Sequence, residues 1–217
     1  MLKMHDFQNT WDKSFKKKQN FLLYPNEHII RFVNQYIKKR TNLKLPKSQK
    51  KCLDIGCGSG RHIIYLYKNG FNVSGIDISK IALQQTKSLI KYSKIKKKIK
   101  LNLCSATNIN FNSNFFDFLI SHGTFDSMPY KDCQKSINES FRILKEKGFF
   151  YVDLISDKVK NKGKFINKFD QLISSEHEKN TIQSYFNIKR IKNNFRKFKI
   201  IKIYKVSIKE NKKLIDE

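Results

Sequence analysis

The chain has 217 residues, of which 39% are hydrophobic, so it is long and apolar enough to fold as one domain with a buried core. It contains no apolar run of membrane-spanning length, and its first residues lack the apolar stretch of a signal peptide, so we expect a cytoplasmic protein without membrane partners. Lys and Arg number 45 against 18 Asp and Glu, which gives a net charge of +27.

This excess of positive charge has two interpretations. It can mark a surface that binds nucleic acid, or it can reflect the bias toward Lys, Asn and Ile that an AT-rich genome produces. The basic residues occur in small runs, at residues 16–18, 38–40 and 96–98, rather than in one stripe. Arg, which binds phosphates and bases better than Lys, is scarce. Compositional bias is therefore favoured, and nucleic acid is the less favoured partner.

The four cysteines show no paired C-x-x-C spacing. We expect reduced thiols, three of them in or beside predicted strands or turns, and no zinc or other metal site. The four cysteines are Cys52, Cys57, Cys104 and Cys133.

Two amphipathic helices are predicted before residue 40. Thr10 can cap the first of them, which carries Trp11 and Phe15 on one side. Asn26 can cap the second. Its buried stripe consists of aliphatic residues at helical spacing, namely Ile29, Ile30, Val33 and Ile37.

Residues 51–62, KCLDIGCGSGRH, organise the rest of the chain. A short apolar strand at residues 52–55 is followed by three glycines spaced two apart and then by the helical pattern of residues 63–66. Glycine allows the backbone to turn sharply and leaves no Cβ between it and a ligand. A strand, a glycine turn and a helix are typical of the start of a doubly wound α/β fold.

The residues around the glycines indicate which ligand the turn binds. The dinucleotide pattern is G-x-G-x-x-G, but the glycines here run G-x-G-x-G and position 61 is Arg. Asp54 lies two residues ahead of the first glycine, where a carboxylate would repel a pyrophosphate and suit an amino-bearing ligand.

The acid and the glycines resemble motif I of the class I S-adenosylmethionine-dependent methyltransferases. The resemblance implies that the cofactor S-adenosyl-L-methionine binds at Asp54 and at the turn residues Gly56, Cys57, Gly58 and Gly60. The alternative is a glycine turn that binds nothing, and the combination of three glycines with an acid argues against it.

A second acid follows about twenty residues later, at the end of a predicted strand over residues 71–76. Asp77 is expected to accept both ribose hydroxyls, with Ile78 against the adenine and Ser79 as the cap of the next helix. Asp77 could instead be a helix cap only, which is common.

The third and fourth strands are predicted at residues 99–104 and 116–121. The family commonly has an acid over the adenine after the third strand, whereas this chain has Ser105 and Ala106, so only a weaker contact from Ser105 is expected. The resemblance also places Ser121 in the cofactor site. His122 follows the fourth strand where a methyl acceptor would approach, and it is the candidate catalytic residue, with Asp126 as a weaker candidate.

The resemblance also gives the first residues a role. In similar methyltransferases a leading helical segment covers the cofactor, so residues 1–24 are interpreted as a lid and residues 25–217 as the methyltransferase domain. Trp11, Phe15 and Tyr24 are the lid candidates, and ordinary packing aromatics are the alternative.

The remaining elements complete a three-layer α/β/α sandwich with a doubly wound, seven-stranded, mostly parallel sheet whose last strand is reversed. Residues 156–180 are expected to form a mobile insertion. The predicted elements are a helix at 131–145, the fifth strand at 149–155, the sixth at 181–186, a helix at 187–196 and the seventh strand at 198–208.

The resemblance implies in-line transfer of a methyl group from a sulfonium to a nucleophile, which requires mainly alignment and desolvation. A compact domain without an added recognition module favours a small-molecule acceptor, such as a metabolite, a sugar or a natural-product intermediate. The alternatives are an RNA or protein methyltransferase that uses the basic surface, a cofactor-binding protein without catalysis, and a nicotinamide enzyme, which Asp54 and the glycine spacing disfavour.

Overall fold

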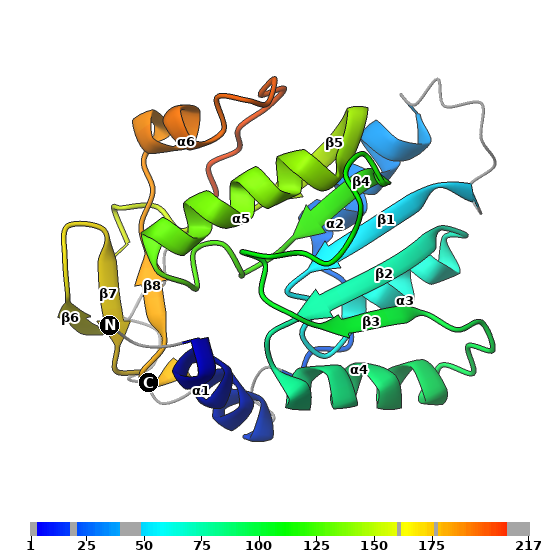
Figure 1. Cartoon of the computed structure of the whole chain (residues 1–217), viewed down its shortest axis with the longest axis horizontal. Helices are drawn as coiled ribbons and strands as arrows, with labels where there is room; N and C mark the ends of the chain where they lie inside the picture. The colour runs from blue at the N-terminus through cyan, green and yellow to red at the C-terminus, as the bar shows by residue number, and fades with distance from the viewer. Residues whose placement is uncertain (1–3, 18–20, 40–48, 160–161, 176–177, 208–217) are drawn as a thin grey trace, which may run out of the picture.

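The structure is a computed structural model with a central sheet of five parallel strands (Figure 1). The sheet order is β3-β2-β1-β4-β5, so the chain starts in the middle, runs to one edge and returns past β1 to build the other half. The structure describes residues 4–17, 21–39, 49–159, 162–175 and 178–207. The five strands are β1 (Lys51–Ile55), β2 (Asn72–Asp77), β3 (Lys100–Leu103), β4 (Phe116–Ser121) and β5 (Leu144–Val152).

Helices cover both faces of this sheet, as predicted (Figure 1). Side chains alternate along each strand, so Cys52 and Leu53 of β1 lie in two different hydrophobic clusters. Leu53 packs on the side of α5 (Tyr130–Ile143), and Cys52 on the side of the remaining sheet-covering helices. Those helices are α2 (Glu27–Phe32), the π-helix η1 (Val33–Lys38), α3 (Arg61–Lys68) and α4 (Lys80–Tyr92).

The predicted seven-stranded sheet is not confirmed, because the described residues place only five strands in the central sheet. The expected sixth strand forms β8 (Ile182–Ser184) of a separate antiparallel sheet with β6 (Gly163–Phe165) and β7 (Asp170–Ile173). The segment interpreted as a mobile insertion therefore contains two strands. Residues 198–207 form no strand, and the end of the expected seventh strand, residue 208, lies outside the described residues.

Hydrogen bonds explain why β8 lies away from the central sheet. The backbone N–H of Ser184 donates to the carbonyl of Asp126 at 2.7 Å, and Gln183 Nε2 donates to the same carbonyl at 2.9 Å. The Ser184 hydroxyl donates to the carbonyl of Met128 at 2.5 Å. These bonds hold β8 against the loop between β4 and α5, at the end of the sheet where that loop emerges. The helix α6 (Ile188–Asn194) follows and contributes to one wall of a groove described below.

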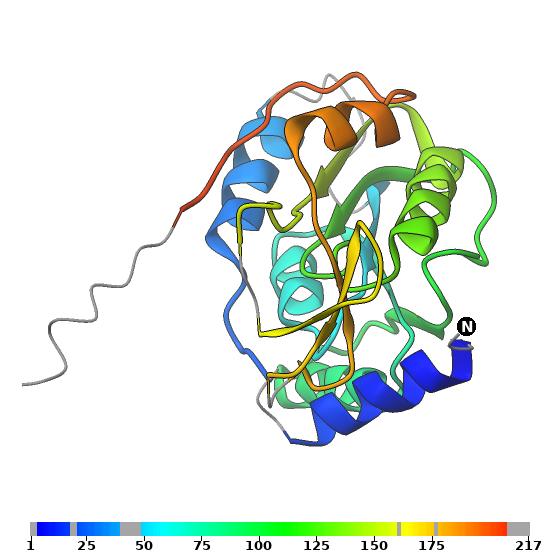
Figure 2. The ribbon, with the colours of Figure 1, turned by 90° about the vertical axis from the view of Figure 1, so that its left-hand side faces the viewer.

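The N-terminal helix α1 (Met4–Lys16) lies beside α4 (Figure 2). It begins before the predicted cap Thr10, whose hydroxyl instead donates to the carbonyl of Asp6 at 2.8 Å within the helix. Asn26 and Ser79 cap α2 and α4 as predicted, each accepting a bond from a first-turn N–H. Among the described residues, no helix is long and apolar enough to cross a membrane.

Candidate functional site

The three glycines of the turn after β1 have different structural roles. All three have positive φ, which side chains other than glycine rarely adopt. A Cβ on Gly56 would lie 2.0 Å from Oγ1 of Thr124, and one on Gly60 would lie 2.7 Å from Cγ2 of Thr86. At Gly58 the nearest atom would be a ring carbon of Phe15 at 3.5 Å. Gly56 and Gly60 therefore allow close packing, whereas a Cβ on Gly58 would meet only the ring of Phe15 at ordinary contact distance.

Asp77 is buried beside this turn at the end of β2. One carboxyl oxygen accepts the N–H of Gly58 and the other accepts the N–H of Ser79, each at 2.8 Å. Burial raises the pKa of Asp77 to about 6, although these N–H bonds favour its ionised form. Each oxygen keeps further lone pairs. The carboxyl group thus fixes the turn to the start of α4 and can still accept ribose hydroxyls.

Asp54, in β1, is buried with neither carboxyl oxygen hydrogen-bonded in the described part of the chain. Burial, and then the charge of Asp77, raises the pKa of Asp54 to about 8. A buried acceptor without a donor is costly. The unpartnered carboxyl group of Asp54 therefore suits a ligand that carries an amino group, as the expected cofactor does.

His62, in α3, is a neighbour of Asp54 that sequence reasoning missed. Its Nε2 accepts the backbone N–H of Asn26 at 3.2 Å, so in the neutral ring the proton lies on Nδ1, which is 3.9 Å from Asp54 Oδ2. Burial and the charge of Arg61 lower the pKa of His62 to about 3. The only feature of the sequence that could have pointed to His62 is its position next to Arg61, directly after the glycines.

His122 lies at the carboxyl end of β4, as predicted, and is held from two sides. Arg61 Nη2 lies 3.4 Å from its Nδ1, and Asp153 Oδ2 lies 3.3 Å from its Nε2. Arg has donors only, so Nδ1 accepts and Nε2 carries the proton toward Asp153. Burial lowers the pKa of His122, and Asp153 opposes this shift.

Sequence reasoning missed Arg61 and Asp153, although both stand at characteristic positions. Asp153 directly follows β5, at the same sheet edge as His122, and its second oxygen accepts the N–H of Gly123 at 2.8 Å. Arg61 opens α3 after the last glycine. The carboxyl end of a central strand is a usual place for a functional side chain in this architecture, and this signal could have identified Asp153.

Asp126, the weaker candidate, is almost completely buried in the loop after β4. Burial raises its pKa to about 8, and the charge of Asp153 adds to the shift. The loop after β4 and the end of β5 therefore bring two carboxyl groups and one imidazole to the same edge of the sheet.

The remaining predicted cofactor residues differ in burial and in their contacts within the chain. Ser121 is buried, and its hydroxyl donates to the carbonyl of Ile55 at 3.1 Å, so it joins β4 to β1. Ala106 belongs to the hydrophobic core. The hydroxyl of Ser105 lies 2.8 Å from that of Thr107 and stays half-buried. Ile78, next to Asp77, is also half-buried, as a residue beside a ligand would be.

Two of the three lid candidates lie on α1, close to the glycine turn. Phe15 is buried near Gly58, and Trp11 contacts its ring with centroids 6.3 Å apart. Asp12 holds the helix in place, because its Oδ1 accepts the hydroxyl of Ser79 at 2.5 Å and the N–H of Ile81 at 3.1 Å. Sequence reasoning missed Asp12.

Tyr24, the third candidate, lies apart from the other two and is 83% exposed. Its carbonyl accepts a bond from Arg61 Nη1 at 3.4 Å. The segment before α2 therefore touches the same Arg61 that contacts His122.

Comparison with known proteins supports the expected chemistry. Residues 46–210 match the model of a family described as a methyltransferase domain. The chain is 32% identical over 107 residues to EEF1A lysine methyltransferase 2 of Danio rerio, covering 46% of each chain. It is 34% identical over 90 residues to an uncharacterised methyltransferase of Schizosaccharomyces pombe, covering 42% of this chain and 61% of that protein. Matches span less than half the length of the first curated relatives.

Solved structures show the same fold. An S-adenosylmethionine-dependent methyltransferase of Methanosarcina mazei superposes with a TM-score of 0.63 at 21% identity, covering 81% of this chain and 84% of that one. A protein of Methanococcus maripaludis described as a putative enzyme of the same kind gives 0.53 at 23% identity, over 70% of this chain and 64% of that one.

Proposed function

Because this chain belongs to the S-adenosylmethionine-dependent methyltransferases, we propose that it methylates an amine nitrogen of a small-molecule acceptor. One observation carries this proposal: Asp126, Asp153 and His122 meet at the carboxyl edge of the sheet, beside the glycine turn. Two carboxyl groups at this edge favour an acceptor that arrives as an ammonium ion.

The cofactor would be held by the residues around the turn. Bound there, it supplies an electrophilic methyl group on a sulfonium. Asp54 would accept from its amino group, Asp77 would accept from its ribose hydroxyls, and the backbone at Gly58 would lie against it. The unpartnered oxygens of Asp54 support this assignment, and at Gly58 a Cβ would meet only the ring edge of Phe15, at 3.5 Å.

The acceptor would be prepared by the second group of residues. An ammonium has no lone pair, so it must lose a proton before the nitrogen can attack. Asp126 has a pKa of about 8, so its ionised form, which becomes populated as the pH rises toward 8, would take that proton. His122 is neutral and directs Nε2–H toward Asp153, so it would orient the acceptor rather than act as the base.

We propose a small acceptor because helix α1 covers part of the site. Helix α1 lies over the start of α4 and packs Phe15 against the glycine turn. A helix that covers the reactants in this way would favour a substrate small enough to be enclosed. Methyl transfer benefits from such exclusion of water.

A protein lysine is the second candidate acceptor. Residues 21–24 are large apolar side chains that stay 37%, 48%, 54% and 83% exposed next to Arg61. Exposed apolar patches of this kind often contact other proteins. The name of the Danio rerio relative, a lysine methyltransferase, points in the same direction.

The acceptor class can be tested with cofactor that carries a labelled methyl group. The purified protein would be incubated in parallel with a small-metabolite extract, with total protein and with total RNA, at physiological salt. We expect label in the small-metabolite fraction. Label in a protein fraction would establish the second candidate instead, and label in RNA alone would contradict both.

A further inference from the structure

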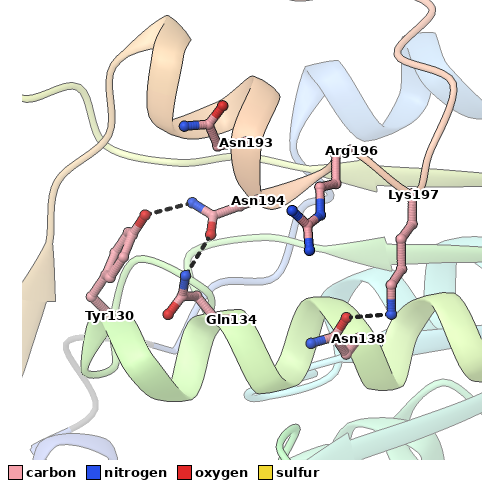
Figure 3. A pocket seen from close by; sticks show the side chains of 7 residues that line it. All are labelled: Tyr130, Gln134, Asn138, Asn193, Asn194, Arg196 and Lys197. Atoms are coloured by element: carbon pink, nitrogen blue, oxygen red, sulfur yellow. Dashed lines mark hydrogen bonds between the residues drawn. The ribbon is translucent and has the colours of Figure 1, made fainter.

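A groove of about 610 Å³ lies between α5 and α6, and none of the residues that line it belongs to the candidate active site (Figure 3). Its volume falls within the range of small-molecule sites, roughly 300–1,000 Å³. It is far larger than one tetrahedral anion needs, since a water molecule occupies about 30 Å³ in the liquid. The groove can therefore hold a ligand with several polar groups.

Both walls of the groove are polar. On α5, Tyr130, Gln134 and Asn138 are spaced four residues apart and so lie along one face of the helix. The other wall is the end of α6 and the turn after it. Its lining residues are Asn193, Asn194, Arg196 and Lys197.

Hydrogen bonds across the groove fix its width. Asn194 Nδ2 donates to the Tyr130 hydroxyl at 2.7 Å, and Gln134 Nε2 donates to Asn194 Oδ1 at 3.1 Å. At the other end Lys197 Nζ donates to Asn138 Oδ1 at 3.0 Å (Figure 3). The groove is thus a built feature of two packed elements.

These bonds leave mainly donors available in the groove. The guanidinium of Arg196 lies between Asn194 and Lys197 and makes no hydrogen bond within the described part of the chain (Figure 3). The Nδ2 of Asn138 likewise has no partner there, because only its Oδ1 is bonded. Lys197 keeps two of its three donors.

The charge of the groove is positive and uncompensated. Its lining holds a guanidinium and an ammonium and no carboxylate. The two carboxylates that α5 carries, Asp132 and Glu139, pair with Lys135 at 3.1 Å and with Arg142 at 2.8 Å on the same helix. Neither cation of the groove is therefore neutralised by α5.

We propose that this groove binds a ligand carrying phosphate groups. Phosphate oxygens are strong acceptors without donors, and they match a wall of amide N–H groups, a guanidinium and an ammonium. Asn, Gln, Tyr, Arg and Lys side chains are also the groups that proteins use on phosphodiester backbones. The proposal goes beyond methyl transfer, and it does not depend on the identity of the methyl acceptor.

Two probes distinguish the sources of such phosphate groups. Pyrophosphate represents a free phosphate metabolite, and a short single-stranded oligouridylate represents an RNA strand. Binding of each to the full chain is measured by titration calorimetry at 0.15 M salt, where charges beyond about 8 Å are largely screened. Tighter binding of pyrophosphate would identify a metabolite site, and tighter binding of the oligouridylate would identify a strand-binding site.

The variant Arg196→Ala tests the location of the site. Loss of a charge-assisted contact should weaken the preferred probe about tenfold, while S-adenosylmethionine affinity stays unchanged and shows that the fold is intact. The matched control is Lys192→Ala, which removes one charge from α6 outside the groove lining and should change affinity by less than about twofold.

Three results would overturn the proposal. The first is that neither probe binds more tightly than about 1 mM. The second is equal weakening by Arg196→Ala and Lys192→Ala, which would indicate diffuse charge rather than a site. The third is an oligoglutamate peptide competing as well as the phosphate probes, which would show a site for anions in general.

Discussion

At the scale of single residues, we expect Gly56 to serve packing and Gly58 to serve cofactor binding. Gly56→Ala and Gly58→Ala both place a Cβ at positive φ, which costs roughly 1–2 kcal/mol. Gly56→Ala also forces a contact 2.0 Å from Thr124, which adds about 1–3 kcal/mol of overpacking. In urea unfolding we therefore expect Gly58→Ala to lose about 1–2 kcal/mol and Gly56→Ala to lose clearly more. Gly58→Ala should in addition weaken cofactor binding. Equal stability of the two variants would contradict these roles.

The raised pKa of the buried Asp54 carboxyl group predicts how the stability of the fold depends on pH. Its pKa is about 8 in the folded chain against an ordinary 3.8, so between these values the folded state binds the proton that the unfolded state has released. Stability should therefore be highest below about pH 4 for this group and should fall as the pH rises toward 8. In denaturant unfolding at pH 5 and pH 8, Asp54→Asn should lose less stability than the unmodified chain. An identical loss in both proteins would show that Asp54 does not titrate in this way.

In the proposed function, Asp126 is the general base that takes a proton from the acceptor. Asp126→Asn keeps the shape of the side chain but cannot accept a proton, and removal of a general base typically costs about 10²–10⁴ in turnover. Cofactor affinity, measured by calorimetry, should be unchanged. Asp132→Asn is the matched control, since it alters a partly exposed carboxylate on α5 that pairs with Lys135. Parallel loss of affinity and turnover in Asp126→Asn would assign the residue a structural role.

At the scale of elements, α1 should act as a cover whose position depends on Asp12. The carboxylate accepts two bonds from the start of α4, and such capping bonds contribute about 0.5–2 kcal/mol. In Asp12→Ala we expect faster hydrogen exchange in α1 and about tenfold weaker cofactor binding. The control Lys13→Gln changes an exposed residue of the same helix and should alter neither. Unchanged exchange in Asp12→Ala would show that other contacts hold α1.

The elements differ in how far sequence could predict them. The predicted strand at residues 116–121 coincides with β4, and Ser79 caps α4, because buried parallel strands and helix caps have local signatures. The sixth strand was wrongly assigned to the central sheet. Its partner is set by bonds from Gln183 and Ser184 to the loop after β4, and such contacts between distant segments leave no local pattern.

The residues of the candidate site also divide into those with a local sequence pattern and those that depend on contacts between distant segments. Asp54, Asp77 and the glycines could be proposed as cofactor residues from the sequence because they stand at fixed distances along the chain. Asp12 and Asp153 were missed because the contacts that implicate them, to Ser79 and to His122, join segments that are far apart in sequence.

At the scale of the whole molecule, the fold brings the two groups of proposed site residues to one edge of the central sheet. The ends of β1 and β2 carry the residues assigned to the cofactor, and the ends of β4 and β5 carry those assigned to the acceptor. From β1 the chain first adds strands on one side of the sheet and then, with β4, on the other side. Ligands bind at this point of reversal in open α/β sheets. In the proposed function, this topology would bring the cofactor and the acceptor together at one edge of the sheet.

The most direct test of this account is methyl transfer to a metabolite extract whose amines have been blocked. The extract is divided, one half is acetylated to remove nucleophilic amines, and both halves are incubated with the protein and labelled S-adenosylmethionine. We predict label in the untreated half and its loss after acetylation. Equal labelling of the two halves would contradict an amine acceptor at Asp126 and Asp153.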